Sequence, residues 1–235
     1  DLEHDRIIRG HHTNLESIRQ AFLTKQFILV YQPKVNMRTG CIIGVEALIR
    51  WQHPQRGLLP PASFLPAIEN DALSAEIGDW VIGEALRQMS KWRTDGLRIP
   101  VSINVGAYQL QHGNFLESLR TQLARHPDIL PADLCIEILE TSALDDLLHV
   151  ASIILECRQI GVTFSLDDFG TGYSSLTYLK RLDVDELKID KSFVHDILSD
   201  PDDLSILAGI LGLSRSLSRQ VIAEGVETEA HGVLL

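Results

Sequence analysis

The strongest constraint on the fold is an alternation of short apolar stretches with longer helical ones. Seven stretches have the length and pattern of strands: residues 27–33, 41–51, 99–105, 134–140, 161–166, 184–190 and 220–225. Helical patterns separate the later ones, which predicts a parallel sheet covered by helices. The first two are joined only by the turn 36–40, and so short a link requires them to run antiparallel.

Size and composition favour a single globular domain. The chain has 235 residues, of which 45% are hydrophobic and 23% charged, and this is enough for one α/β barrel. A net charge of −11 without a basic stripe argues against polymeric nucleic acid as a partner. No apolar run is long enough to span a bilayer, and no signal peptide is visible. We therefore expect a cytoplasmic domain without membrane contact of its own, either free or as the cytoplasmic part of a membrane-anchored protein.

Polar side chains recur at or near the carboxyl ends of five successive expected strands. They are Asn104, Glu137, Asp167 with Asp168, Lys188 and Glu224. Barrel enzymes place their chemistry at this end of the sheet. Taken alone, the adjacent acids after residues 161–166 could simply begin a turn and cap the next helix. Five strands that end in this way favour a shared polar site.

Two charged residues also interrupt the apolar strand 41–51. Period two places Glu46 and Arg50 on one face of this strand, with Leu48 between them. A buried charge is costly unless it has a partner. Two interpretations stay open: an internal ion pair between Glu46 and Arg50, or a metal ligand beside a phosphate clamp.

The oxygen donors suit hard divalent cations such as Mg²⁺ or Mn²⁺. One ion would take Glu46, Asn104, Glu137 and Asp167, and a second would take Asp168 and Glu224 with Asp167 shared. Two ions about 3.5–4 Å apart would stabilise the attacking and leaving oxygens of a phosphoryl displacement. No serine or cysteine nucleophile motif is present, so water is the expected nucleophile. Lys188 could orient that water and hold phosphate charge; the alternative is a salt bridge that closes the barrel.

Several short motifs follow one another in a fixed order. They are Tyr31-Gln32-Pro33, Glu46-Ala47-Leu48-Ile49-Arg50-Trp51, the stretch from Asp167-Asp168-Phe169-Gly170 to Leu176, Leu187-Lys188-Ile189-Asp190, and Ala223-Glu224-Gly225-Val226-Glu227. Together they resemble the EAL domain family, bacterial phosphodiesterases specific for cyclic di-GMP. The resemblance runs from about residue 14 to the end of the sequence.

The resemblance implies a modified TIM (β/α)8 barrel with one antiparallel strand. It divides the chain into a linker, residues 1–13, and a C-terminally truncated phosphodiesterase domain, residues 14–235. By this resemblance, the chain lacks the last strand and helix of the family's barrel. A barrel that is open at this point would leave strand edges unpaired. The resemblance also implies a homodimer and attachment to a GGDEF or sensory domain.

The implied reaction is hydrolysis of cyclic di-GMP to linear pGpG with two Mg²⁺ or Mn²⁺ ions, Ca²⁺ being non-productive. By similarity, Glu46, Asp168 and Lys188 are catalytic. The metal ligands are those named above, and the substrate contacts are Gln32, Leu48 and Arg50. Glu140 is implied to fix the loop that follows Asp168.

The chain departs from the family pattern at three supporting positions. Gly106 stands where a hydroxyl residue is usual, Leu139 where Thr is usual, and Asp183 where Pro is common. Since every implied ligand position is filled, an active enzyme is favoured over a catalytically silent cyclic di-GMP receptor. An unrelated metal-dependent barrel hydrolase or lyase is the third hypothesis.

Overall fold

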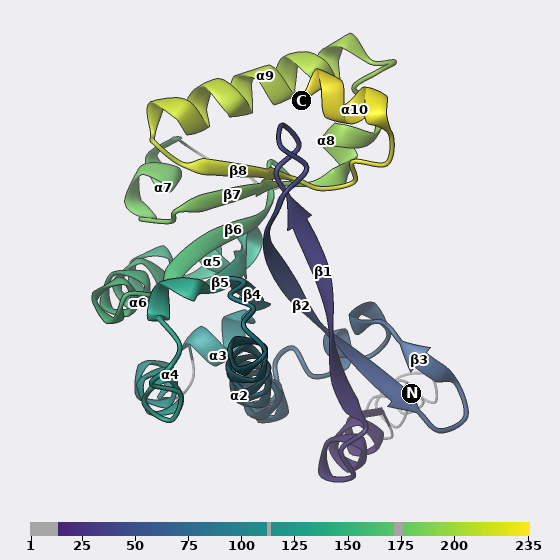
Figure 1. The fold of residues 1–235 in the computed structure, drawn as a ribbon, viewed down its shortest axis with the longest axis vertical. Helices are drawn as coiled ribbons and strands as arrows, with labels where there is room; N and C mark the ends of the chain where they lie inside the picture. The colour runs from purple at the N-terminus through teal and green to yellow at the C-terminus, as the bar shows by residue number, and fades with distance from the viewer. Residues whose placement is uncertain (1–13, 112–113, 172–175) are drawn as a thin grey trace, which may run out of the picture.

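A computed structural model describes residues 14–111, 114–171 and 176–235 of the chain (Figure 1). Its centre is one curled sheet in the order β1-β2-β4-β5-β6-β7-β8, with β3 paired to β2. Strand β1 is antiparallel to β2, and the strands from β2 along this path to β8 are parallel. The bounds are β1 Phe27–Val35, β2 Ile42–His53, β3 Gly57–Leu59, β4 Val101–Asn104, β5 Leu134–Leu139, β6 Thr163–Phe169, β7 Glu186–Ile189 and β8 Gln220–Ala223.

Helices lie along the outside of the curled sheet (Figure 1). Several begin at an aspartate whose side chain accepts a backbone N–H, as Asp71 does for α2 and Asp146 for α6. Residues 14–23 are also helical. The other bounds are α2 Ala72–Thr94, α3 Ala107–Gln111, α4 Phe115–Ala124, α5 Glu140–Asp145, α6 Leu147–Ile160, α7 Leu176–Arg181, α8 Lys191–His195, α9 Pro201–Ser216 and α10 Glu229–Leu234.

The hydrophobic core lies between the sheet and these helices. Successive residues of a strand point to opposite faces, so Ile136 and Ile138 of β5 enter this core while Glu137 points to the other side. Leu187 and Ile189 flank Lys188 of β7 in the same way. Because the apolar residues are buried against the helices, the polar residues between them point to the inner face of the curled sheet.

The fold agrees with the expected modified barrel, including its antiparallel first strand. Within the described residues, β1 pairs only with β2 and β8 only with β7, so the sheet has two open edges. The glycine and prolines of residues 57–61 predict a loop, and this expectation was wrong: residues 57–59 form the short strand β3. Three residues are too few for a period to be recognised, and their pairing with β2 decides the conformation.

Other expectations concern boundaries or undescribed residues. Glu140 begins α5 instead of ending β5. The sequence pattern predicts a helix over residues 78–92, but α2 already begins at Ala72. The predicted linker 1–13 and residues 172–175 of the glycine-rich motif lie outside the described residues. In the ranges that the structure covers, no helix combines the length and the apolar character needed to cross a bilayer.

We predict opposite effects of alanine at two glycines. Gly161 ends α6 with φ of 104°, and an added Cβ would lie 3.4 Å from Cβ of Pro131. Gly161→Ala should lower the free energy of unfolding by about 1–2 kcal/mol, because side chains disfavour this left-handed conformation. The matched control Gly209→Ala, inside α9 with open space around it, should raise it by about 0.5–1 kcal/mol. Urea unfolding measures the free energy of unfolding of both variants. Changes of the same sign would contradict the different roles assigned to the two glycines.

Candidate metal centre

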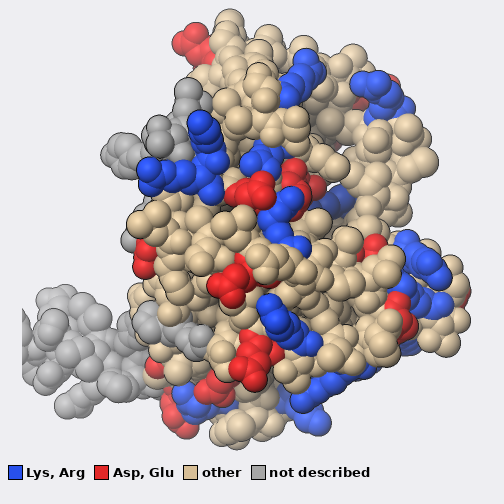
Figure 2. Space-filling view, turned by 90° about the vertical axis from the view of Figure 1, so that its left-hand side faces the viewer, with Lys and Arg blue, Asp and Glu red and all other residues tan. Residues whose placement is uncertain are grey.

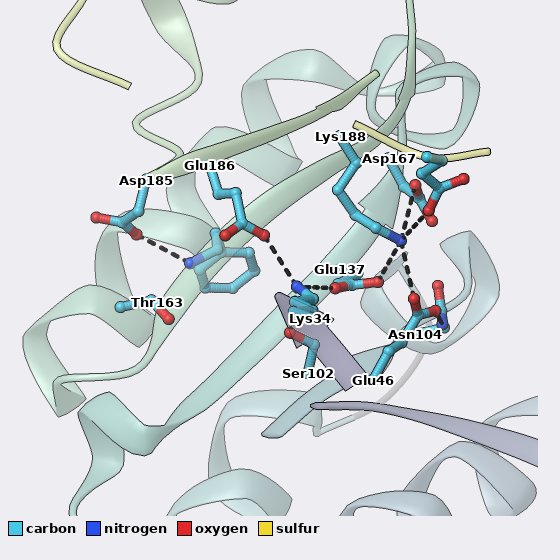
Figure 3. A network of polar contacts seen from close by, with 12 residues as sticks. Lys34, Glu46, Ser102, Asn104, Glu137, Thr163, Asp167, Asp185, Glu186 and Lys188 are labelled. Carbon is cyan, nitrogen blue, oxygen red and sulfur yellow. Dashed lines mark hydrogen bonds and ion pairs between the residues drawn. The ribbon is translucent and has the colours of Figure 1, made fainter. Parts of the chain in front are cut away.

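The inside of the curled sheet holds a lysine surrounded by acids (Figure 3). Nζ of Lys188 lies 2.8 Å from Glu137 Oε2, 3.2 Å from Glu46 Oε2, 3.1 Å from Asp167 Oδ1 and 2.8 Å from Glu224 Oε1. The lysine side chain is only 2% exposed. One ammonium thus neutralises part of a cluster in which carboxylates outnumber it.

Strand pairing explains how residues far apart in sequence meet here. Asn104 of β4 is paired with Glu137 of β5, and Gln32 of β1 lies opposite Glu46 of β2. Nδ2 of Asn104 donates a hydrogen bond to Glu46 Oε1 at 2.7 Å. The parallel strands therefore deliver their polar residues to one region, as expected for the carboxyl ends of a barrel sheet.

Two groups of carboxylates are compact enough to hold a divalent cation. Oxygens of Glu46, Glu137 and Asp167 lie within 4.8 Å of one another, and so do oxygens of Asp167, Asp168 and Glu224. Asp167 belongs to both groups. Hard oxygen donors of this kind are preferred by Mg²⁺, Mn²⁺ and Ca²⁺. The residues present therefore fit one or two such ions.

The acids of the cluster differ in the direction in which their pKa values are shifted. Burial raises the pKa of Glu46 and of Asp167, and the neighbouring Glu137 raises both further. Burial alone would raise the pKa of Glu137 too, but the ammonium groups of Lys188 and Lys34 outweigh it and lower that pKa. Of these three acids, Glu137 is thus the one whose ionised form is favoured by its surroundings.

Asp168 has an unusual backbone conformation, with φ of 55°. Non-glycine residues rarely adopt it, and such strain is concentrated at functional sites. Burial raises the pKa of Asp168, and the adjacent Asp167 adds to the effect. Just beyond, Oε2 of Glu140 accepts a hydrogen bond from the Gly170 N–H at 2.9 Å. This contact ties the segment after Asp168 to the start of α5.

A cleft of about 590 Å³ opens beside the acids, within the usual size range of small-molecule sites. Gln32 and Leu48, two of the predicted substrate contacts, line it. Arg50 is not among the described lining residues, and its Nη1 donates instead to the Ile49 carbonyl at 2.9 Å. The lining also includes the apolar residues Pro61, Ala62, Leu65, Pro66 and Ile77. The cleft is thus lined by both charged and apolar side chains.

Two charged residues that the sequence reasoning missed belong to the same network. Nζ of Lys34 lies 2.8 Å from Glu137 Oε1 and 3.0 Å from Glu186 Oε1. The available signal was period two, because Lys34 follows Gln32 by two residues and Glu186 precedes Lys188 by two.

The outer surface carries charges of both signs. On the face drawn in Figure 2, Lys and Arg are interspersed with Asp and Glu rather than gathered into a band. A continuous basic track, which would suit a polymeric nucleic acid, does not cross this face.

Comparisons with known proteins show which family and fold this chain resembles. The family model described as the EAL domain matches residues 15–233. MucR of Pseudomonas aeruginosa, a bifunctional diguanylate cyclase/cyclic di-GMP phosphodiesterase, is 45% identical over 218 residues, which are 92% of this chain and 32% of MucR. The cyclic di-GMP phosphodiesterase PdeR of Escherichia coli is 37% identical over 220 residues, 93% of this chain and 33% of PdeR. The chain spans about a third of the length of these curated relatives.

Solved structures share the fold. The PaMucR phosphodiesterase in its c-di-GMP complex has a TM-score of 0.90 and 44% identity, covering 95% of this chain and 90% of that one. The EAL enzyme Bd1971, with cAMP and cyclic di-GMP bound, has a TM-score of 0.91 and 34% identity, covering 97% and 62%. With a family model that matches nearly its whole length, the chain belongs to the EAL domain family.

Proposed function

We propose that this domain is a metal-dependent phosphodiesterase that hydrolyses cyclic di-GMP to linear pGpG. The observation that carries the proposal is the convergence of Glu46, Glu137, Asp167, Asp168 and Glu224 into two adjoining groups beside an open cleft. The names of relatives support it, since MucR and PdeR are cyclic di-GMP phosphodiesterases. The similar PaMucR structure is a complex with c-di-GMP.

We assign two Mg²⁺ or Mn²⁺ ions to these acids. One set of ligands is Glu46, Asn104, Glu137 and Asp167, and the other is Asp167, Asp168 and Glu224. When bound, such ions lower the pKa of water and stabilise charge that develops on phosphate oxygens. Ca²⁺ accepts the same ligands with looser geometry and stays a predicted non-productive ion.

The protein's own side chains supply the remaining tasks. The Lys188 ammonium occupies the same carboxylate oxygens that a cation would use, so the two compete. If bound cations neutralise those acids instead, the Lys188 ammonium can hold a phosphate oxygen or orient the attacking water. Gln32 and Leu48 would contact substrate from the cleft wall. A contact from Arg50, on the same strand face as Leu48, stays a prediction.

The alternative function is a catalytically silent cyclic di-GMP receptor. A receptor needs the cleft but not a complete set of carboxylates, and the presence of both groups of acids favours turnover. Membership of the EAL family disfavours an unrelated hydrolase or lyase. A homodimer, a cytoplasmic location and attachment to a GGDEF or sensory domain stay predictions about the whole protein.

The direct test is incubation of the chain with cyclic di-GMP and Mn²⁺ or Mg²⁺, with pGpG measured by chromatography. Glu46→Gln should lower kcat/KM at least ~100-fold, because losing even a neighbour of a metal ligand costs about 10–100-fold. Glu84→Gln is the matched control, since Glu84 pairs with Arg87 on the surface of α2 and should leave activity intact. Tight binding without pGpG would favour the receptor. The absence of both binding and turnover would contradict the proposal.

A second prediction concerns the charge balance at Lys188. In metal-free protein, Lys188→Met leaves buried carboxylates without their shared ammonium, so the free energy of unfolding should fall by about 3–5 kcal/mol. Added Mn²⁺ should then stabilise the variant more than the unmodified chain. Arg87→Met, which breaks an exposed pair, should cost less than about 1 kcal/mol. Equal responses of Lys188→Met and the unmodified chain to Mn²⁺ would argue against competition for the same oxygens.

A third prediction concerns Glu140, whose carboxylate holds the Gly170 N–H. Glu140→Ala should lower kcat/KM about 10-fold or more, since a hydrogen bond to a charged group contributes about 1.5–3 kcal/mol. Glu140→Gln should lose less, because its amide oxygen can still accept this hydrogen bond. Circular dichroism checks that both variants are folded, and Glu84→Ala is the matched control. Full activity in folded Glu140→Ala would remove Glu140 from the positioning of the loop.

A further inference from the structure

We propose that Lys34 is a positioning residue for the metal centre: it holds one oxygen of the Glu137 carboxylate so that the other faces the cation. The inference rests on the proposed function, because it takes Glu137 as a metal ligand. It concerns a residue outside the ligands, cleft contacts and catalytic groups assigned above.

Glu137 lies between two lysines (Figure 3). Its Oε1 accepts from Lys34 Nζ and its Oε2 from Lys188 Nζ, each at 2.8 Å, and its side chain is fully buried. Each carboxylate oxygen thus has its own ammonium partner.

The two lysines differ in their other contacts. Lys188 also touches Glu46, Asp167 and Glu224, which are proposed metal ligands. Lys34 instead contacts Ser102 Oγ at 2.8 Å and Glu186 Oε1 at 3.0 Å. A cation among the ligands therefore competes for the oxygen that Lys188 holds, whereas the contact on the Lys34 side does not conflict with it.

Lys34 is held firmly enough for this task. An ammonium has three N–H donors, and Ser102, Glu137 and Glu186 give it three acceptors from three different strands, β4, β5 and β7. Its side chain is 10% exposed. A buried, fully partnered lysine has little freedom to swing, so Glu137 is fixed through it to the frame of the sheet.

Two simpler roles make different predictions. If Lys34 were only a counter-charge, its removal would make the cluster more negative and would tighten cation binding by Coulomb attraction. If it only joined strands, its removal would lower stability and leave cation affinity unchanged. A positioning role requires weaker cation binding in a protein that is still folded.

The test measures the Mn²⁺ dissociation constant by calorimetry for the unmodified chain and for Lys34→Met and Lys34→Arg, with folding checked by circular dichroism. We expect Lys34→Met to bind Mn²⁺ about 10-fold or more weakly, as for other groups that orient metal ligands. Lys34→Arg should recover part of the affinity because a guanidinium can still donate to Glu137. Arg93→Met is the matched control, because it breaks a similarly buried pair with Asp133. That residue precedes the amino end of β5, whereas Glu137 lies further along the strand, so the Mn²⁺ affinity should not change.

A charge-balanced double variant, Lys34→Met with Glu186→Gln, separates orientation from charge and carries the test if Lys34→Met does not fold. It removes one positive and one negative charge, so weaker Mn²⁺ binding would report the lost anchor of Glu137. Unchanged or tighter Mn²⁺ binding by either folded variant would overturn the inference while the proposed function stands. Failure of the unmodified chain to bind Mn²⁺ would overturn the proposed metal centre itself.

Discussion

Repulsion between carboxylates inside the curled sheet is the constraint to which the rest of this structure responds. Glu46, Glu137, Asp167 and Glu224 cannot all be ionised in a buried space without positive charge among them. In the structure, Lys188 contacts all four acids, and Lys34 adds a second ammonium at Glu137. A divalent cation is a better partner for the same oxygens. The acids are therefore compatible with two states, one balanced by an internal ammonium and one by external ions.

The apolar core determines where these charges point. Glu137 lies between Ile136 and Ile138, and Lys188 between Leu187 and Ile189, all four of them buried. A slip of one residue in strand pairing would turn every one of these side chains to the opposite face. Such a slip would expose isoleucines and bury the charges among helices. The hydrophobic effect that forms the sheet thus also sets the direction of the site residues.

Local pattern was enough to predict the parallel sheet, the antiparallel hairpin and the acids at strand ends, because each depends on periodicity within a short stretch. The strand Gly57–Leu59 could not be predicted in this way, since it is too short for a period and exists through its pairing with β2. The contact between Lys34 and Glu186 could not be predicted for another reason. These residues are 152 positions apart, and only the register of the assembled sheet brings them within 3.0 Å.

The reversed first strand explains why a second lysine reaches Glu137 from a separate direction. Each parallel strand presents its carboxyl end to the cleft, so a lysine on such a strand competes for the oxygens that face a cation. Strand β1 runs the other way, and Lys34 lies opposite Gly44, before Glu46 on β2. It therefore approaches Glu137 from the amino-terminal side of the parallel strands. The departure from a regular barrel is what separates the ammonium that a cation can displace from the one that stays in place.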